Sequence, residues 1–138
     1  MSELSQQDLQ NLAMQHREHQ KNAQTVQQQL NMVQMSIEDC IRAIGTLDDL
    51  SSADESLDAM FPIGSGSFIH GKVDKVDKVV VDVGAGISIE KSVEDAKDIL
   101  NKRKAEFQKA LERMNASLAK ISQRIQSIES AIRENNPQ

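Results

Sequence analysis

Residues 61–90 read FPIGSGSFIHGKVDKVDKVVVDVGAGISIE, and this stretch decides the fold because it is the one part of the chain that does not read as helix. It holds five of the six glycines and one of the two prolines, the residues least compatible with a helix interior. A long segment with a heptad pattern lies on each side of it. The sequence therefore predicts two helical arms joined by a small β unit that reverses the chain.

Four short runs rich in β-branched residues predict strands within and just before this stretch. They are Ala59–Ile63, Ser67–Val73, Lys78–Val83 and Ile87–Glu90, separated by GSG at 64–66, DKVD at 74–77 and GAG at 84–86. Each spacer suits a tight turn, so we expect antiparallel strands arranged as two central hairpins. The predicted turn glycines are Gly64, Gly66, Gly84 and Gly86.

The β unit, residues 57–90, is too small to bury an apolar face alone. Roughly thirty residues in four short strands cannot close a barrel, and the outer strand edges stay open. We therefore expect the unit to pair with the same unit of other chains. Alternation places Ile69, Gly71, Val73, Val79, Val81, Val83, Ile87 and Ile89 on one shared face, and Phe68, His70, Val80 and Asp82 on the other. The predicted oligomerisation residues are Phe68, Ile69, Val73, Val79, Val81, Val83, Ile87 and Ile89.

The first arm, residues 1–51, is predicted to be a coiled-coil helix. Spacings of three and four from Leu9 mark an uninterrupted seam of roughly six heptads. A helix of that length cannot bury its seam on itself, so it requires a partner helix. The seam consists of Leu9, Leu12, His16, His19, Ala23, Val26, Leu30, Val33, Ile37, Cys40, Ile44 and Leu47.

The second arm, residues 91–135, begins with a hydroxyl cap at Ser92 and an acid three residues later at Asp95. Because the arms are similar in length and the connector reverses the chain, antiparallel pairing within one chain is the simplest arrangement. The predicted fold is thus one α+β domain, mainly α, with a long antiparallel coiled coil and two central hairpins. The second seam runs Val93, Ala96, Leu100, Arg103, Phe107 and, after a stutter, Leu111, Met114, Leu118, Ile121, Ile125, Ile128 and Ile132.

The far ends of the two arms are unequally apolar. The second seam ends in four isoleucines, whereas the opposing strip of the first arm contains His16, His19 and Ala23. Apolar surface is therefore expected to stay partly exposed at the tips, where it could bind partner proteins. The alternative for each residue is ordinary coiled-coil core. The predicted tip residues are Leu9, Leu12, Met14, Ile125, Ile128 and Ile132.

Composition limits the class of protein. The 138 residues include three Phe and no Trp or Tyr, which favours elongated helices over a compact globule. A single cysteine rules out an internal disulfide. No apolar run approaches the ~18–20 residues that span a bilayer, and the start lacks a signal peptide's pattern. A net charge of −5 argues against nucleic acid as the main partner. We expect a cytoplasmic protein without a membrane partner.

No constellation for catalysis, cofactor binding or metal binding stands out, so we expect neither an enzyme nor a cofactor. VGAGIS at 83–88 and GSGS at 64–67 do not complete a phosphate loop, and hairpin turns explain them better. Cys40 lies ~30 Å along the helix from His19, so one chain cannot gather His16, His19 and Cys40 around a metal. The histidines are better interpreted as tolerated polar seam positions, with a metal shared between chains as the alternative.

The middle of the chain resembles the signature of α-class prefoldin subunits. The matching segments are a P-(I/L)-G-x-G-S-F strand at Pro62–Phe68, a valine strand ending in VGxG at Val79–Gly86, and the start of the next helix at Ile89–Ser92. Together with the two-arm layout, the resemblance to short archaeal α-class subunits covers essentially the whole chain.

The resemblance implies a heterohexamer of two α-class and four β-class subunits. Their hairpins would form a double β-barrel platform from which six coiled coils hang. It also implies an ATP-independent co-chaperone that holds non-native polypeptides near the coiled-coil tips and passes them to a group II chaperonin. The alternative is a coiled-coil scaffold or tether that docks folded proteins and has no effect on aggregation.

Overall fold

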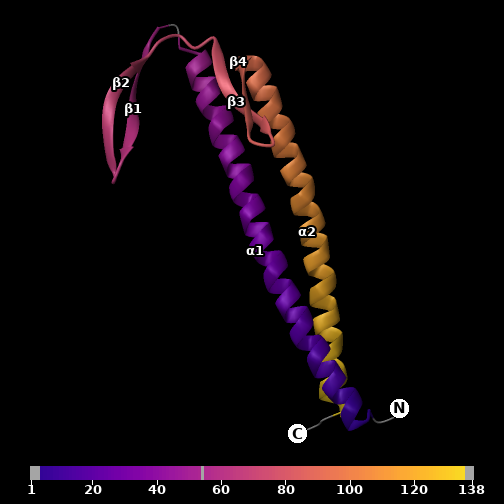
Figure 1. The fold of residues 1–138 in the computed structure, drawn as a ribbon. Coiled ribbons are helices and arrows are strands. Elements are labelled where there is room, and N and C mark those ends of the chain that lie inside the picture. Colours follow the sequence, from indigo (N-terminus) through magenta and orange to yellow (C-terminus); the bar gives the residue numbers. More distant parts are fainter. Residues whose placement is uncertain (1–3, 54, 136–138) are drawn as a thin grey trace. The chain divides into compact units, whose positions relative to one another are not determined.

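The computed structural model describes residues 4–53 and 55–135, which form two long helices and, between them in the sequence, two β-hairpins (Figure 1). The prediction of a mainly helical α+β chain with two central antiparallel hairpins is confirmed. Residues 1–3 of the predicted first arm lie outside the described part. In chain order the elements are α1 (Gln6–Ser51), β1 (Leu57–Gly64), β2 (Ser67–Val73), β3 (Lys78–Gly84), β4 (Ile87–Ser92) and α2 (Val93–Asn135).

Both helices begin at side chains that cap them. Ahead of α1, the N–H of Asp8 donates to Ser5 Oγ and the N–H of Ser5 donates to Asp8 Oδ2, each at 3.1 Å. This reciprocal pair is a capping box. At the start of α2, the N–H of Asp95 donates to Ser92 Oγ at 3.1 Å, as predicted. Since Ser92 is also the last residue of β4, the chain passes from strand to helix without a linker.

The chain forms two compact units. The first, called here the arm unit, joins residues up to 35 with residues from 107 onward, and its described residues are 4–35 and 107–135. The second, called here the hairpin unit, comprises residues 36–106, of which all but residue 54 are described.

In the arm unit, the first part of α1 runs antiparallel to the last part of α2, as the indigo and yellow segments of Figure 1 show. The N–H of Leu4 donates to Asn135 Oδ1 at 3.4 Å, and His16 Nε2 lies 2.9 Å from Glu129 Oε1. The predicted seam positions of this unit are all buried or half-buried. Leu30 and Ile128 are the most enclosed, at 5% and 8% exposure. The heptad pattern therefore predicted which helix faces pack together.

In the hairpin unit, the four strands form two separate two-stranded sheets. β1 pairs with β2 and β3 pairs with β4, both antiparallel. The expectation of a tight turn at 74–77, and of one face shared by all four strands, is wrong. No pairing joins β2 to β3 among the described residues. The sequence DKVD lacks a glycine for the left-handed conformations of a tight hairpin turn, and Val76 packs against the core of the unit instead.

The two hairpin turns fall where the glycines predicted them. The central residues Ser65 and Gly66 have φ values of 50° and 72°, and Ala85 and Gly86 have values of 54° and 74°. Positive φ at both central residues is typical of the type I′ turn, whose twist suits paired strands. Gly64 and Gly84, which precede these pairs, also have positive φ.

The core of the hairpin unit joins β3 to both helices. Arg103, the polar position in the predicted second seam, donates from its guanidinium to the backbone carbonyl of Asp82. This bond ties α2 to the end of β3 and explains why an arginine occupies a seam position. The buried members of the core cluster are Leu47, Val81, Val93, Ala96 and Leu100.

Candidate interaction surfaces

The β1–β2 hairpin exposes apolar side chains on both faces. Phe61 lies directly opposite Ile69 in the register, so the two share a face. They are 42% and 52% exposed, and Ile63 is 63% exposed. The other face carries Met60 and Phe68, at 61% and 54% exposure. An isolated two-stranded hairpin is only marginally stable in water, and apolar surface of this kind is typical of a region that a partner covers.

Within this hairpin, an aromatic ring covers a glycine. A Cβ added to Gly71 would lie 2.8 Å from Cε2 of Phe61. The ring therefore occupies the space that a side chain at position 71 would need, which explains a glycine inside a strand.

The β3–β4 hairpin has one face against its own helices and one face open. Val81 is 7% exposed and belongs to the core cluster, whereas its neighbour Val80 is 72% exposed. Val81, predicted to contact other chains, thus lies in the core of its own chain. Val83 and Ile87, beside the turn, are 42% and 57% exposed. The other predicted assembly residues, Val73, Val79 and Ile89, are half-buried.

Sequence reasoning missed four exposed apolar residues that belong to the same surfaces. In β1, the alternation of Leu57, Ala59, Phe61 and Ile63 was the available signal for an apolar face. Alternation puts Val80 on the second face with Phe68, His70 and Asp82, so the sequence does not predict it as an assembly residue. The four missed residues are Met60, Phe61, Ile63 and Val80.

Each hairpin also has unpaired outer edges within the described residues, because each sheet contains two strands. Unpaired N–H and C=O groups along a strand are a template for another strand. The hairpin unit therefore offers both apolar side chains and open backbone for assembly.

The predicted tip residues separate into two groups. Leu9, Leu12, Ile125 and Ile132 are half-buried, and Ile128 is buried at 8% exposure, so these five lie in the seam between the helices. Met14 is 67% exposed and lies outside the seam. The structure thus brings the first group together and separates Met14 from it.

The histidines and the cysteine have ordinary surroundings. His16 makes its 2.9 Å contact with Glu129 across the helix pair, which gives a polar seam position a polar partner. His19 is half-buried and Cys40 is buried. In the part of the chain that the structure describes, no three His, Cys, Asp or Glu side chains gather as they would around a metal ion.

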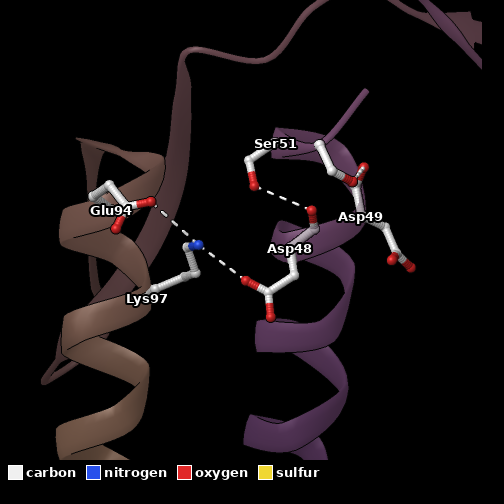
Figure 2. A network of polar contacts seen from close by, with 6 residues as sticks. Asp48, Asp49, Ser51, Glu94 and Lys97 are labelled. Carbon is white, nitrogen blue, oxygen red and sulfur yellow. Dashed lines mark hydrogen bonds and ion pairs between the residues drawn. The ribbon is translucent and has the colours of Figure 1, made fainter. Parts of the chain in front are cut away.

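One ion-pair network joins the two helices of the hairpin unit (Figure 2). Lys97 Nζ lies 2.9 Å from Asp48 Oδ1 and 3.2 Å from Glu94 Oε1. The hydrogen bond to Asp48, followed by that to Glu94, raises the pKa of Lys97 above its ordinary value of 10.5. Lys97 therefore stays charged at a higher pH in the folded chain than in the unfolded chain.

The stabilisation from Lys97 should be present below pH 10.5 and should be lost as the pH rises through the raised pKa. We expect Lys97→Met to lower the urea midpoint of the isolated chain at pH 8, and the difference from wild type to shrink above pH 10.5. Lys102→Met is the control, since Lys102 is exposed on α2 and has no ion pair among the described residues. A difference in urea midpoint between wild type and Lys97→Met that stays constant across this pH range would contradict a stabilising role of the charged Lys97 side chain.

No helix within residues 4–53 and 55–135 combines the length and apolar character needed to cross a membrane.

Comparison with known proteins points to one family. The prefoldin family model, described as "Prefoldin subunit", matches residues 5–138. A prefoldin subunit alpha of Methanococcoides burtonii is 55% identical over 138 residues, covering all of both chains. One of Methanosarcina mazei is 44% identical over 132 residues, covering 94% of this chain and 92% of that protein.

A solved structure has a similar fold. The cryo-EM structure of filamentous PFD from Methanocaldococcus jannaschii matches with a TM-score of 0.72, covering 86% of this chain and 98% of that one. Its sequence identity is 22%, so the match establishes the fold alone.

Proposed function

Because this chain belongs to the prefoldin family, we propose that its hairpins join it to β-class subunits and that its arm tips hold non-native polypeptides. Prefoldin is a chaperone family and not an enzyme family, so the chain is a chaperone subunit. Subunits of this family form a multi-subunit complex with one another. The observation that carries the assignment is the 55% identity to a prefoldin subunit alpha along the full length.

The proposed complex contains two α-class and four β-class chains, joined through a β-barrel platform. The exposed apolar residues of β1–β2, together with Val80, Val83 and Ile87 of β3–β4, support this use of the hairpins. Their open strand edges support it as well, because an added strand would satisfy them.

The proposed clients are unfolded proteins, which the complex passes to a group II chaperonin in the cytoplasm. Most of the tip residues are half-buried between two helices, so a client reaches them when the tips separate. Each contact is weak, and several arms on one platform add avidity. Binding of this kind is reversible without ATP.

To test the tip assignment, the first 15 and last 15 residues would be deleted from the chain in its complex with a β-class partner. This removes Met14 and all five seam residues of the tip. We expect suppression of aggregation of a chemically denatured protein to fall several-fold, because the loss is repeated on each α-class arm.

Native mass spectrometry supplies the control for this deletion, since the mass should fall only by that of the deleted residues. Unchanged suppression with an intact complex would show that clients bind elsewhere. Binding to native proteins without any effect on aggregation would instead favour a tether.

A further inference from the structure

Two shallow grooves flank the helix pair of the arm unit. The first, called here the Lys21 groove, has an apolar floor of Ala23, Leu118 and Ile125, and Arg17 and Lys21 border it. Four glutamine and serine side chains complete its wall among the remaining lining residues, Gln20, Gln24, Gln27 and Ser122. All of these residues belong to the arm unit.

The second groove, called here the Arg124 groove, has the same chemistry. Ile128 contributes apolar surface, and Lys120 and Arg124 line it with His19. Its remaining lining residues are Gln15, Gln123 and Ser127. Each groove thus places two permanent cations beside the seam, which contributes three apolar side chains to the Lys21 groove and the largely buried Ile128 to the Arg124 groove.

The cations of both grooves are available to a ligand. Arg17, Lys21, Lys120 and Arg124 are all exposed. None of them takes part in an ion pair in residues 4–53 and 55–135. No acidic side chain lines either groove. One acid of this unit, Glu129, is already in contact with His16. The grooves therefore present cationic side chains that make no ion pair, beside apolar surface.

We propose that these grooves bind extended client segments in which apolar residues are interspersed with aspartate or glutamate. The inference rests on the proposed holding function and adds a class of client to it. Apolar side chains of the segment would cover Leu118 and Ile125 in the Lys21 groove, or the small exposed part of Ile128 in the Arg124 groove. Its carboxylates would meet the two cations of the groove that it occupies. The glutamines beside them can donate to the backbone of any bound segment. Charge complementarity thus favours acidic-apolar segments over neutral or basic ones of equal hydropathy.

The test measures fluorescence anisotropy of labelled peptides with the full-length chain, which holds both grooves. The probes are a short peptide of repeated Ser-Leu-Glu triplets and matched peptides with Gln or Lys in place of Glu. We expect the Glu peptide to bind about tenfold tighter than the Gln peptide at low salt. Tenfold corresponds to about 1.4 kcal/mol, which is within the range of two exposed ion pairs, the number that each groove offers. The preference should shrink at high salt, because exposed charges are screened.

The test variant carries four substitutions together, Arg17→Gln, Lys21→Gln, Lys120→Gln and Arg124→Gln. Glutamine was chosen because its helix propensity is close to that of lysine and arginine. It should bind the Glu and Gln peptides with equal affinity. Two double variants are then compared. The variant Arg17→Gln, Lys21→Gln should lose part of the preference for the Glu peptide over the Gln peptide. Lys109→Gln with Arg113→Gln should keep it, because these exposed cations of the same unit line neither groove.

The possible results separate this inference from the holding function. Equal affinity of wild type for the Glu and Gln peptides, or an equal loss of preference in the Lys109 and Arg113 variant, overturns the groove assignment. Loss of aggregation suppression on deleting the tips would still support the holding function in either case. A preference for the Glu peptide that disappears only when the groove cations are removed supports the proposal.

Discussion

Replacing Val81 with aspartate is expected to lower the free energy of unfolding of the isolated chain by about 4 kcal/mol, enough to unfold much of the hairpin unit. Val81 is 7% exposed and clusters with Leu47, Ala96 and Leu100. A carboxylate at this position would be desolvated among these apolar side chains, and the nearby Arg103 already donates to the backbone carbonyl of Asp82. Both helices lose a packing contact, so the damage should extend beyond β3.

Urea unfolding followed by far-UV circular dichroism measures this effect. The matched control is Val80→Asp, the next residue on the same strand, which is 72% exposed. Its effect on the isolated chain should stay within about 0.5 kcal/mol, as for most surface substitutions. If the two variants unfolded at the same urea concentration, the inward orientation of Val81 would be wrong.

The long helices could be predicted from sequence because their signal is repetitive. Every seam position indicates the same face of the helix, so a single polar residue such as His16 or Arg103 does not change the predicted heptad frame. The structure also explains these two exceptions. His16 meets Glu129 across the helix pair, and Arg103 donates to the carbonyl of Asp82. Neither contact could be deduced from spacing alone, since each depends on which residues the partner element places opposite.

The β unit was predicted less completely because alternation identifies an apolar face without identifying what covers it. Val81 and Ile69 look alike in sequence, yet Val81 packs on the helices of its own chain and Ile69 is 52% exposed. The separation of the hairpins was also missed. Val76 in the DKVD linker reads as a turn residue, whereas its side chain joins the core of the hairpin unit. Such choices depend on tertiary packing, which local pattern does not encode.

The groove cations could not be predicted as binding residues from the sequence. Arg17 and Lys21 lie one helical turn apart on α1, as do Lys120 and Arg124 on α2, and such spacing usually marks a solvated face. Only the antiparallel pairing places Leu118 and Ile125 beside Lys21, and Ile128 beside Arg124.

Ile69→Lys is expected to weaken assembly with the β-class partner by at least about 100-fold while leaving the isolated chain folded. Ile69 lies opposite Phe61 on the face that also carries Ile63. If that face is covered in the complex, as we propose, the lysine would place an unpaired charge in an apolar contact. Losses of about 2 kcal/mol or more mark the few hot-spot residues near the centre of an interface, and 2.7 kcal/mol corresponds to about 100-fold.

The control for Ile69→Lys adds the same charge one residue along the strand. His70→Lys changes the opposite face of β2, where Asp58 and Lys72 form a directly opposed pair and already carry charge. That end of the face must stay solvated or ion-paired, so an added lysine should weaken assembly by less than about tenfold. Native mass spectrometry of each variant mixed with the β-class partner gives the fraction of full complex. Circular dichroism of each chain alone shows whether the fold is retained.

The comparison of the two variants discriminates better than either variant alone. A lysine that merely raised the solubility of an exposed hairpin would act equally from both faces, because Ile69 and His70 are both exposed. Loss of the complex with Ile69→Lys alone would assign the buried side of the hairpin to Phe61, Ile63 and Ile69. Loss with His70→Lys alone would transfer that role to the face of Met60 and Phe68. Full complex with both variants would show that β1–β2 contributes to assembly through its backbone edges or not at all. The β3–β4 hairpin would then have to supply the apolar contact through Val80, Val83 and Ile87.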